Sequence, residues 1–200
     1  LINSQTVKAM QIVKKIKKIS LSKSFFSFWR YQFLIKSLNK KIKPYKINRE
    51  ILGVGDVVFA LCYAPKEKKF YLIKQFRPFY FVRKEKYKYE LVGGLVDKGE
   101  NLTSALKREI NEEIGVKTLK IKKLTKYCPA PGYTDEIVHV YYAEVEEIKN
   151  GYLFNKFENE EIKISKLTLN QLKKINSSKQ IQNVLTKVSI YEYLNKIKKN

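Results

Sequence analysis

The sequence predicts an α+β sandwich with a mixed β-sheet, preceded by a basic helical extension. Residues 1–49 contain 13 Lys and Arg and no Asp or Glu, whereas residues 50–200 contain 28 basic and 19 acidic residues. In the second part, strand-like and helix-like apolar segments follow one another without a regular strand–helix–strand repeat. We therefore expect a basic extension over residues 1–49 and one folded domain over residues 50–200.

The extension is expected to contain an amphipathic helix. Apolar residues recur every three positions from Val7 to Ile19 with lysines between them, which suits docking on a partner, a membrane surface or the domain itself. Its basic, acid-free composition also suits a targeting segment, and the mitochondrial matrix and the cytoplasm both stay open as locations. Lysines beside the aromatic residues from Phe25 to Tyr31 suit a nucleic-acid contact. The third interpretation is a compositional bias towards Lys, Ile and Asn on a surface helix.

The folded domain is expected to begin with a β-hairpin. Strands over Val57–Ala64 and Lys69–Phe76 flank a turn at Pro65, and a third strand over Tyr87–Val92 is expected to end at Gly93. Thr103–Ile114 is rich in helix formers, its apolar residues lie near one face, and a glycine follows as the stop signal. The remaining expected elements are the strands Leu119–Tyr127 and Ile137–Val145 and the helices Leu169–Ile175 and Ile181–Ile197.

Composition limits the chemistry of the protein. The longest apolar run, Val57–Ala64, is far shorter than the roughly 20 residues of a transmembrane helix, so none is expected. Two cysteines, Cys62 and Cys128, cannot form a disulfide framework or a four-thiolate zinc site. A single histidine, His139, disfavours His-dependent catalysis. A metal site here is expected to use oxygen ligands and to bind Mg²⁺ or Mn²⁺.

One carboxylate cluster stands out in the predicted helix Thr103–Ile114. Glu109, Glu112 and Glu113 are spaced three and four residues apart, which places them close together on the helix surface. Like charges this close repel unless a cation neutralises them. Arg108 adjoins the cluster, and Glu100 in the preceding loop is expected to pair with Arg108 and fix the loop to the helix.

The spacing around this cluster is more specific than the cluster alone. Gly94 is followed after five residues by Glu100, and seven residues later by Arg-Glu-apolar-x-Glu-Glu-x-Gly-apolar, ending at Val116. This pattern is the Nudix box, and the chain resembles a Nudix hydrolase, which implies an α/β/α sandwich with a mixed sheet. Four further segments resemble ADP-ribose and nucleoside-diphosphate-sugar pyrophosphatases of this superfamily, so that the resemblance covers residues 50 to about 198. They are Leu72–Pro78, Glu90–Gly94, Pro131–Glu136 and Glu158–Ile162.

The resemblance implies roles for individual residues. Three carboxylates and one backbone carbonyl would bind Mg²⁺ or Mn²⁺, while Arg108 and Glu100 would orient their helix. Arg77 would contact the diphosphate, and Tyr133 would stack on a base or sugar. The metal-binding set is Gly93, Glu109, Glu112 and Glu113; the substrate-binding set is Gln75, Arg77, Pro131 and Tyr133; the candidate general bases are Glu158 and Glu160.

The implied activity is a Mg²⁺-dependent pyrophosphatase that splits ADP-ribose, or a related nucleoside-diphosphate sugar, into AMP and a sugar phosphate. An alternative is a structural or RNA-associated subunit of a large assembly, such as a mitochondrial ribosome or respiratory complex, contacted through residues 1–49. A hydrolase of oxidised nucleotides or a decapping enzyme ranks lower because of Pro131 and the Gln75–Pro78 segment. The family is commonly dimeric, so a homodimer is also expected.

Overall fold

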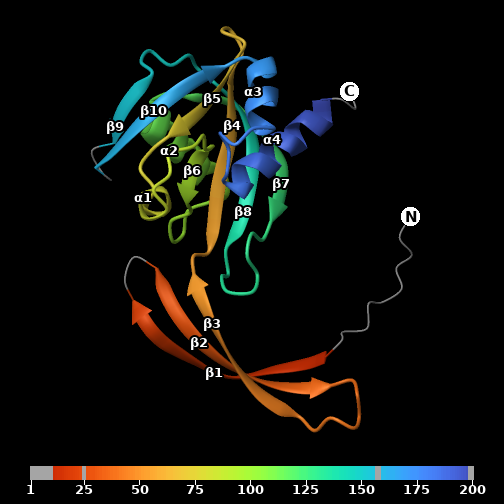
Figure 1. The fold of residues 1–200 in the computed structure, drawn as a ribbon. Helices are drawn as coiled ribbons and strands as arrows, with labels where there is room; N and C mark the ends of the chain where they lie inside the picture. Colours follow the sequence, from red (N-terminus) through yellow and green to blue (C-terminus); the bar gives the residue numbers. More distant parts are fainter. Residues whose placement is uncertain (1–10, 24–25, 156–158, 198–200) are drawn as a thin grey trace. The chain divides into compact units, whose positions relative to one another are not determined.

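The fold comes from a computed structural model, which describes residues 11–23, 26–155 and 159–197 (Figure 1). The chain divides into two compact units. The N-terminal unit contains the residues up to Val54 together with Ala130–Asp135. The main unit contains Gly55–Pro129 and the residues from Glu136 onward.

The N-terminal unit contains a three-stranded antiparallel sheet with the order β1-β2-β3. Its strands are β1 (Gln11–Lys23), β2 (Ser27–Ser37) and β3 (Tyr45–Gly53). The loop Ala130–Asp135 belongs to this unit and is hydrogen-bonded to Leu52 and Val54. Strands therefore occupy most of the segment for which a helical extension is expected.

The expected amphipathic helix is thus wrong over the described part of the extension. Strand β1 pairs with β2 over its whole length, and its register shifts between Lys15 and Lys17 and again between Ser20 and Ser22. Each bulge adds one residue and interrupts the two-residue alternation of a strand. Apolar residues spaced by three can therefore belong to a strand, and the β-branched Val and Ile residues favour one.

The main unit is built on a seven-stranded mixed sheet with the order β7-β8-β4-β5-β10-β9, in which β6 also pairs with β4. The β4–β8 pairing is parallel and the others are antiparallel. The strands are β4 (Asp56–Ala64), β5 (Lys69–Lys74), β6 (Val92–Leu95), β7 (Thr118–Tyr127), β8 (Ile137–Val145), β9 (Tyr152–Asn155) and β10 (Glu160–Leu167).

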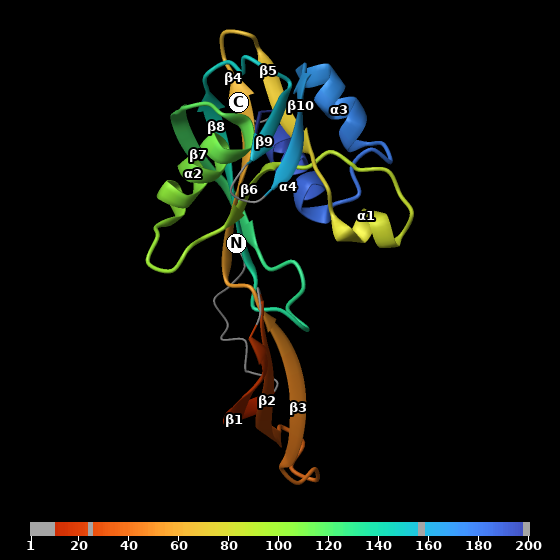
Figure 2. The same ribbon diagram turned by 90° about the vertical axis from the view of Figure 1, so that its left-hand side faces the viewer.

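Helices cover both faces of this sheet. Figure 2 shows α2 (Leu102–Ile114) on one side and α3 (Leu169–Asn176) and α4 (Val184–Ile197) on the other. The predicted α/β/α sandwich with a mixed sheet is therefore confirmed. A short helix, α1 (Pro78–Val82), lies in the connection between β5 and β6. None of the helices in the described ranges has the length and apolar composition needed to cross a bilayer.

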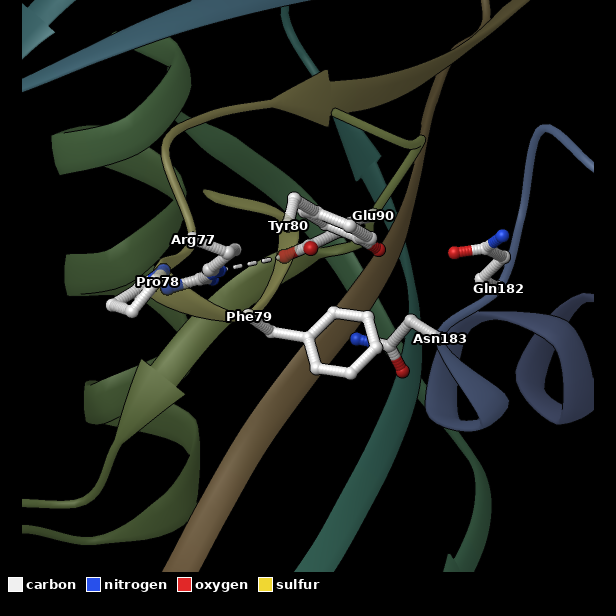
Figure 3. Close-up of a pocket in the computed structure, with 7 residues that line it drawn as sticks. All are labelled: Arg77, Pro78, Phe79, Tyr80, Glu90, Gln182 and Asn183. Carbon is white, nitrogen blue, oxygen red and sulfur yellow. Dashed lines mark hydrogen bonds and ion pairs between the residues drawn. The ribbon is translucent and has the colours of Figure 1, made fainter. Parts of the chain in front are cut away.

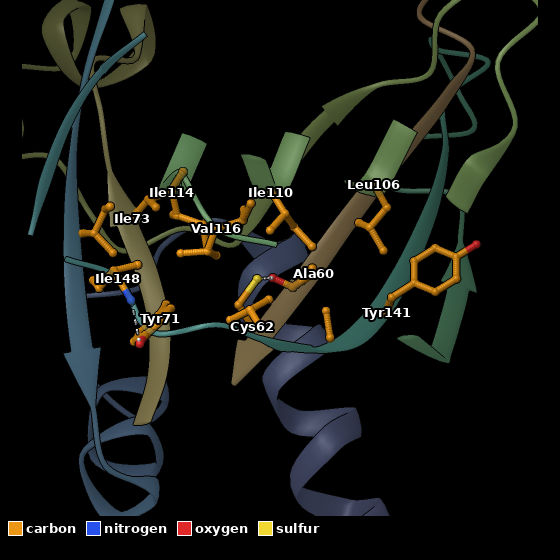
Figure 4. Close-up of a cluster of buried hydrophobic side chains, with 14 of the residues drawn as sticks. Ala60, Cys62, Tyr71, Ile73, Leu106, Ile110, Ile114, Val116, Tyr141 and Ile148 are labelled. Atoms are coloured by element: carbon orange, nitrogen blue, oxygen red, sulfur yellow. Dashed lines mark hydrogen bonds between the residues drawn. The ribbon is translucent and has the colours of Figure 1, made fainter. Parts of the chain in front are cut away.

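The core beneath α2 fixes this helix on the sheet. Leu106 and Ile110 of α2 are fully buried and belong to one apolar cluster with Ala60 and Cys62 of β4 and Tyr71 of β5 (Figure 4). Burying such side chains stabilises the fold by about 1.5–3 kcal/mol each. Burial also raises the pKa of the Cys62 thiol, so this cysteine acts as an apolar core residue.

Two further segments differ from the expected elements. The third strand, expected over Tyr87–Val92, is instead β6 (Val92–Leu95), which contains the glycines that were expected to end it. The resemblance implies a late acidic loop at Glu158–Ile162, but in the described part of this segment β10 begins at Glu160 and pairs there with β9.

Candidate active site

Helix α2 carries the central predicted residues, and both of its ends are capped. The side chain of Asn101 accepts hydrogen bonds from two backbone N–H groups of the first turn, at 3.1 and 2.9 Å. Gly115 ends the helix in the left-handed conformation with φ 68°. Because Leu106 and Ile110 hold the opposite face on the sheet, the charged residues between 108 and 113 keep a fixed orientation.

Arg108, in the middle of this helix, is the centre of an ion-pair network. Its guanidinium donates to Glu100 at 3.0 Å, to Glu109 at 2.8 Å, to Glu112 at 3.2 Å and to the carbonyl of Leu95 at 3.0 Å. The hydrogen bond to Glu100 raises the pKa of Arg108, and the same bond lowers the pKa of Glu100. The expected pairing of Arg108 with Glu100 is therefore present and joins the loop to the helix.

Two glycines make room for two buried carboxylates. The N–H of Gly93 donates to Glu113 at 2.7 Å, and a Cβ on Gly94 would lie 2.6 Å from the Glu109 carboxylate. Gly93 has φ 146°, and a Cβ there would lie 2.0 Å from the Val58 carbonyl oxygen. Such close approaches exclude larger residues. The glycine pair thus brings β6 against β4 on one side and against the α2 carboxylates on the other.

The donor set of this cluster fits a hard divalent cation. Glu109, Glu112 and Glu113 offer only carboxylate oxygens, which Mg²⁺ and Mn²⁺ prefer. The cation beside them in the structure is Arg108, which bridges Glu109 and Glu112. Within residues 11–23, 26–155 and 159–197, no three His, Cys, Asp or Glu side chains are arranged to hold one metal ion. Metal binding would thus exchange contacts with Arg108 for contacts with the ion.

Arg77 lies at a second charged position near this cluster. Its Nε donates to Glu90 at 2.9 Å, and the Gln75 amide oxygen faces the guanidinium when the amide is oriented to satisfy both groups. Burial alone lowers the pKa of Arg77, but the pairing with Glu90 and the charges of Glu113 and Glu160 outweigh it and raise the pKa. Arg77 is thus within the electrostatic reach of the α2 cluster and of β10.

A cavity of about 400 Å³ adjoins Arg77 (Figure 3). The Arg77–Glu90 pair and the Tyr80 ring lie on one side, and Asn183 lies across from them. The lining residues are Arg77, Pro78, Phe79, Tyr80, Glu90, Gln182 and Asn183. Glu90 was not among the predicted site residues, although a lone carboxylate before the apolar pair Leu91-Val92 signals a buried charge that needs a partner.

The other predicted residues lie elsewhere. Pro131 and Tyr133 belong to the N-terminal unit, where the Tyr133 side chain is exposed and its backbone carbonyl accepts from the Leu52 N–H at 2.8 Å. Glu160 is half-buried at the start of β10. Glu158 lies outside the described residues. Substrate binding by Pro131 and Tyr133 stays a prediction, as does a catalytic role for either glutamate.

Comparison with known proteins identifies the family to which this chain belongs. The NUDIX domain matches residues 54–187 of the chain. The chain belongs to the NUDIX family. The predicted family is therefore confirmed, and with it the expectation of a NUDIX pyrophosphatase. NUDIX hydrolases generally use a divalent metal ion, in agreement with the oxygen donors on α2.

Several proteins of known name are similar in sequence to this chain. The ADP-ribose pyrophosphatase of Bacillus subtilis (strain 168) is 32% identical over 149 residues, which cover 73% of this chain and 75% of that protein. The ADP-ribose pyrophosphatase of Escherichia coli (strain K12) is 27% identical over 154 residues, covering 76% and 73%. The GDP-mannose pyrophosphatase of Cronobacter sakazakii is 25% identical over 161 residues, covering 80% and 83%.

A solved structure supports the fold over almost the whole chain. The crystal structure of an ADP compounds hydrolase matches with a TM-score of 0.73 and 17% identity, covering 96% of this chain and 97% of that one. Because the structural match covers 96% of this chain, it extends beyond residues 54–187, which match the NUDIX domain.

Proposed function

We propose that the protein hydrolyses the diphosphate bond of ADP-ribose or a related nucleoside-diphosphate sugar in a Mg²⁺-dependent reaction. The products are AMP, or the corresponding nucleoside monophosphate, and a sugar phosphate. This proposal rests on the carboxylate cluster of α2. The cluster lies against Gly93 and Gly94, and Arg77 is within its electrostatic reach. The activities named for the B. subtilis, E. coli and C. sakazakii relatives support the substrate class.

Each residue of the cluster has a proposed task. Glu109, Glu112 and Glu113, with the backbone carbonyl of Gly93, hold Mg²⁺ or Mn²⁺. When bound, the ion neutralises diphosphate charge and lowers the pKa of a coordinated water. Arg108 orients the helix through its bonds to the preceding loop, so its role is positioning.

Arg77 binds the diphosphate and stabilises the charge that develops on the departing phosphate. Its partial exposure leaves the guanidinium accessible, while Glu90 and Gln75 fix its direction. Water adds to one phosphorus, the bond from that phosphorus to the bridging oxygen breaks, and the bridging oxygen leaves with the other phosphate. Glu160, whose charge reaches Arg77, is the candidate to accept the water proton, with Glu158 as the second candidate.

The first test is AMP release from ADP-ribose in the presence of Mg²⁺. We expect turnover by the wild-type chain and a loss of about 10²- to 10³-fold in kcat for Glu112→Gln and Glu113→Gln. The matched control is Glu146→Gln, which removes the same charge at an exposed position of the main unit. Circular dichroism verifies that each variant is folded.

The substrate range is tested with a panel of nucleoside-diphosphate sugars that includes GDP-mannose. Turnover of GDP-mannose without turnover of ADP-ribose would keep the reaction and change the preferred base and sugar. A folded wild-type chain that hydrolyses no member of the panel with Mg²⁺ or Mn²⁺ would overturn the proposal. Calorimetric titration with Mn²⁺ provides an independent measure, since Glu112→Gln should weaken binding of the ion in the absence of substrate.

A further inference from the structure

Strand β7 forms one edge of the sheet in the main unit, and this edge is strongly basic. In the order of strands, β7 lies at one end and β9 at the other, and no strand of the described ranges pairs with the outer side of β7 (Figure 1). Residues 117–127 contain five lysines and no acidic residue. We call this surface the β7 edge; its exposed lysines are Lys117, Lys120, Lys122, Lys123 and Lys126.

The charge of the β7 edge is not balanced by ion pairs. Among the residues that the structure describes, Lys66, Lys88 and Lys166 form ion pairs with carboxylates, but none of the lysines of the β7 edge does. This holds even for Lys120, although Glu144 lies opposite it in β8. The β7 edge therefore keeps its positive charge available to a binding partner.

The part of this edge that can accept another strand is short and regular. Shifts in the register to β8 interrupt the strand before Lys120 and after Lys123, whereas Lys120–Lys123 pairs with consecutive residues of β8. Just beyond this stretch, the carbonyl of Leu124 accepts a hydrogen bond from the side chain of Lys196 in α4. In an edge strand, alternate backbone N–H and C=O groups point away from the sheet. An added strand would therefore align with Lys120–Lys123.

The side chains of this stretch define which strand would fit. Ile121 packs against the apolar core beneath α2, so Lys120 and Lys122 point to the opposite face of the sheet. Side chains of an added strand would lie about 4.5–5.5 Å from those of β7. The complementary segment thus alternates acidic residues, which lie beside the two lysines, with apolar residues, one of which lies beside Ile121.

The opposite edge of the sheet lacks these features. Strand β9 (Tyr152–Asn155) contains no charged residue, and its neighbour β10 begins with Glu160 and Glu161. An acidic strand would meet carboxylates there and lysines at β7. The two edges of one sheet therefore provide an internal comparison.

We propose that the β7 edge binds an acidic, extended segment of a partner protein by strand addition. Backbone groups of the segment pair with those of β7, while its carboxylates neutralise the lysines. The same lysines disfavour pairing of β7 with β7 of a second copy, because like charges would lie opposite each other. A nucleic acid would supply negative charge, but its phosphate backbone has no N–H donors for the carbonyls of β7.

The experiment titrates the full chain with an eight-residue peptide of alternating Glu and Val that is blocked at both ends and carries a fluorescent label. We expect saturable binding by anisotropy and an affinity that falls as the salt concentration increases. Amide hydrogen exchange should slow in β7 but not in β9. A peptide of alternating Glu and Gly has the same charge but disfavours a strand, so it should bind at least about fivefold more weakly.

Two double variants with the same change in net charge separate the edge from overall charge. Lys120→Glu/Lys122→Glu should weaken binding of the Glu-Val peptide at least about tenfold. Lys174→Glu/Lys179→Glu, at exposed positions in and after α3, should stay within about threefold of wild type. A peptide of alternating Lys and Val should bind the first double variant more tightly than wild type. Circular dichroism verifies that both variants are folded.

Four results would overturn the proposal. The first is the absence of binding by the wild-type chain at low salt. The second is an equal loss of affinity in the two double variants, which would indicate attraction by overall charge alone. The third is protection from exchange outside β7 only. The fourth is an oligouridine that binds more tightly than the Glu-Val peptide and is weakened by Lys120→Glu/Lys122→Glu, which would make the partner a nucleic acid.

Discussion

The α2 cluster and the N-terminal sheet both concentrate charge, but they differ in how that charge is balanced. Arg108 contacts Glu100, Glu109 and Glu112, so its charge is balanced within one helical turn and its preceding loop. In the N-terminal sheet, Lys18 lies over the Trp29 ring, and Glu50 is the only acidic residue of the three strands. The α2 cluster is therefore balanced in charge by Arg108, whereas the N-terminal sheet keeps an excess of positive charge.

The largest expected effect on stability comes from replacing Gly93, whose N–H binds Glu113 of the α2 cluster. Gly93→Ala introduces a Cβ that would lie 2.0 Å from the Val58 carbonyl oxygen at a φ of 146°. Relief of this clash must move β6 away from β4 or from Glu113. We expect a loss of about 3–5 kcal/mol in the free energy of unfolding, measured by urea denaturation, together with loss of hydrolysis.

Gly132→Ala is the matched control for this substitution. A Cβ at Gly132 has no other atom within 4 Å, and its φ is not in the left-handed region. The free energy of unfolding should therefore change by less than about 0.5 kcal/mol. Equal destabilisation by both substitutions would show that β6 does not need the close approach seen in the structure.

The next largest effect is expected from Arg108→Gln, which removes the shared cation. The pKa of Glu100 is lowered by its hydrogen bond from Arg108, so this pair stabilises the fold fully above the unfolded-state value of 4.5. The stabilisation is lost as the pH falls through the lowered pKa of the folded state. Thermal unfolding should show a lower Tm for Arg108→Gln at pH 7, by about 3–6 °C.

The pH dependence distinguishes this pair from a general loss of packing. The difference in Tm between wild type and Arg108→Gln should shrink as the pH falls below 4.5, because Glu100 becomes protonated in both proteins. A difference that is constant from pH 7 to pH 3 would mean that Arg108 stabilises the helix without its ion pairs.

A smaller effect is expected from Glu90→Gln, which tests positioning of Arg77. Glu90 is 5% exposed and keeps Arg77 in place, so the amide should leave the guanidinium less fixed. We expect kcat/KM for ADP-ribose to fall about tenfold, mainly through KM, because the proposed role of Arg77 is to bind the diphosphate. Glu146→Gln, at an exposed position outside this connection, should leave both constants unchanged. A fall in kcat with an unaltered KM would instead place Glu90 in the chemical step.

The sequence predicts best where local signals decide the structure. Ile137–Val145 matches β8 at both ends, and the helix expected over Thr103–Ile114 begins one residue earlier as α2. Here the apolar pattern, the cap at Asn101 and the stop at Gly115 all agree. The carboxylates of the α2 cluster could be found for the same reason, since their spacing is a local property of one helix.

Prediction failed where pairing with distant residues decides the structure. Gly93 and Gly94 normally disfavour a strand, but here they belong to β6 because only glycine fits between β4 and the carboxylates. Glu90 was missed because its partner, Arg77, lies 13 positions away in another segment. The strand β1 was read as a helix because its bulges are visible only against β2.

The smallest effect is expected on the face of the N-terminal sheet where charge is balanced. Arg30 and Glu50 are both exposed, and such ion pairs contribute about 0–1 kcal/mol. Glu50→Gln should therefore leave the free energy of unfolding within about 0.5 kcal/mol of wild type. Urea denaturation measures this difference. A loss above about 1 kcal/mol would show that the Arg30–Glu50 pair contributes more than an exposed ion pair normally does.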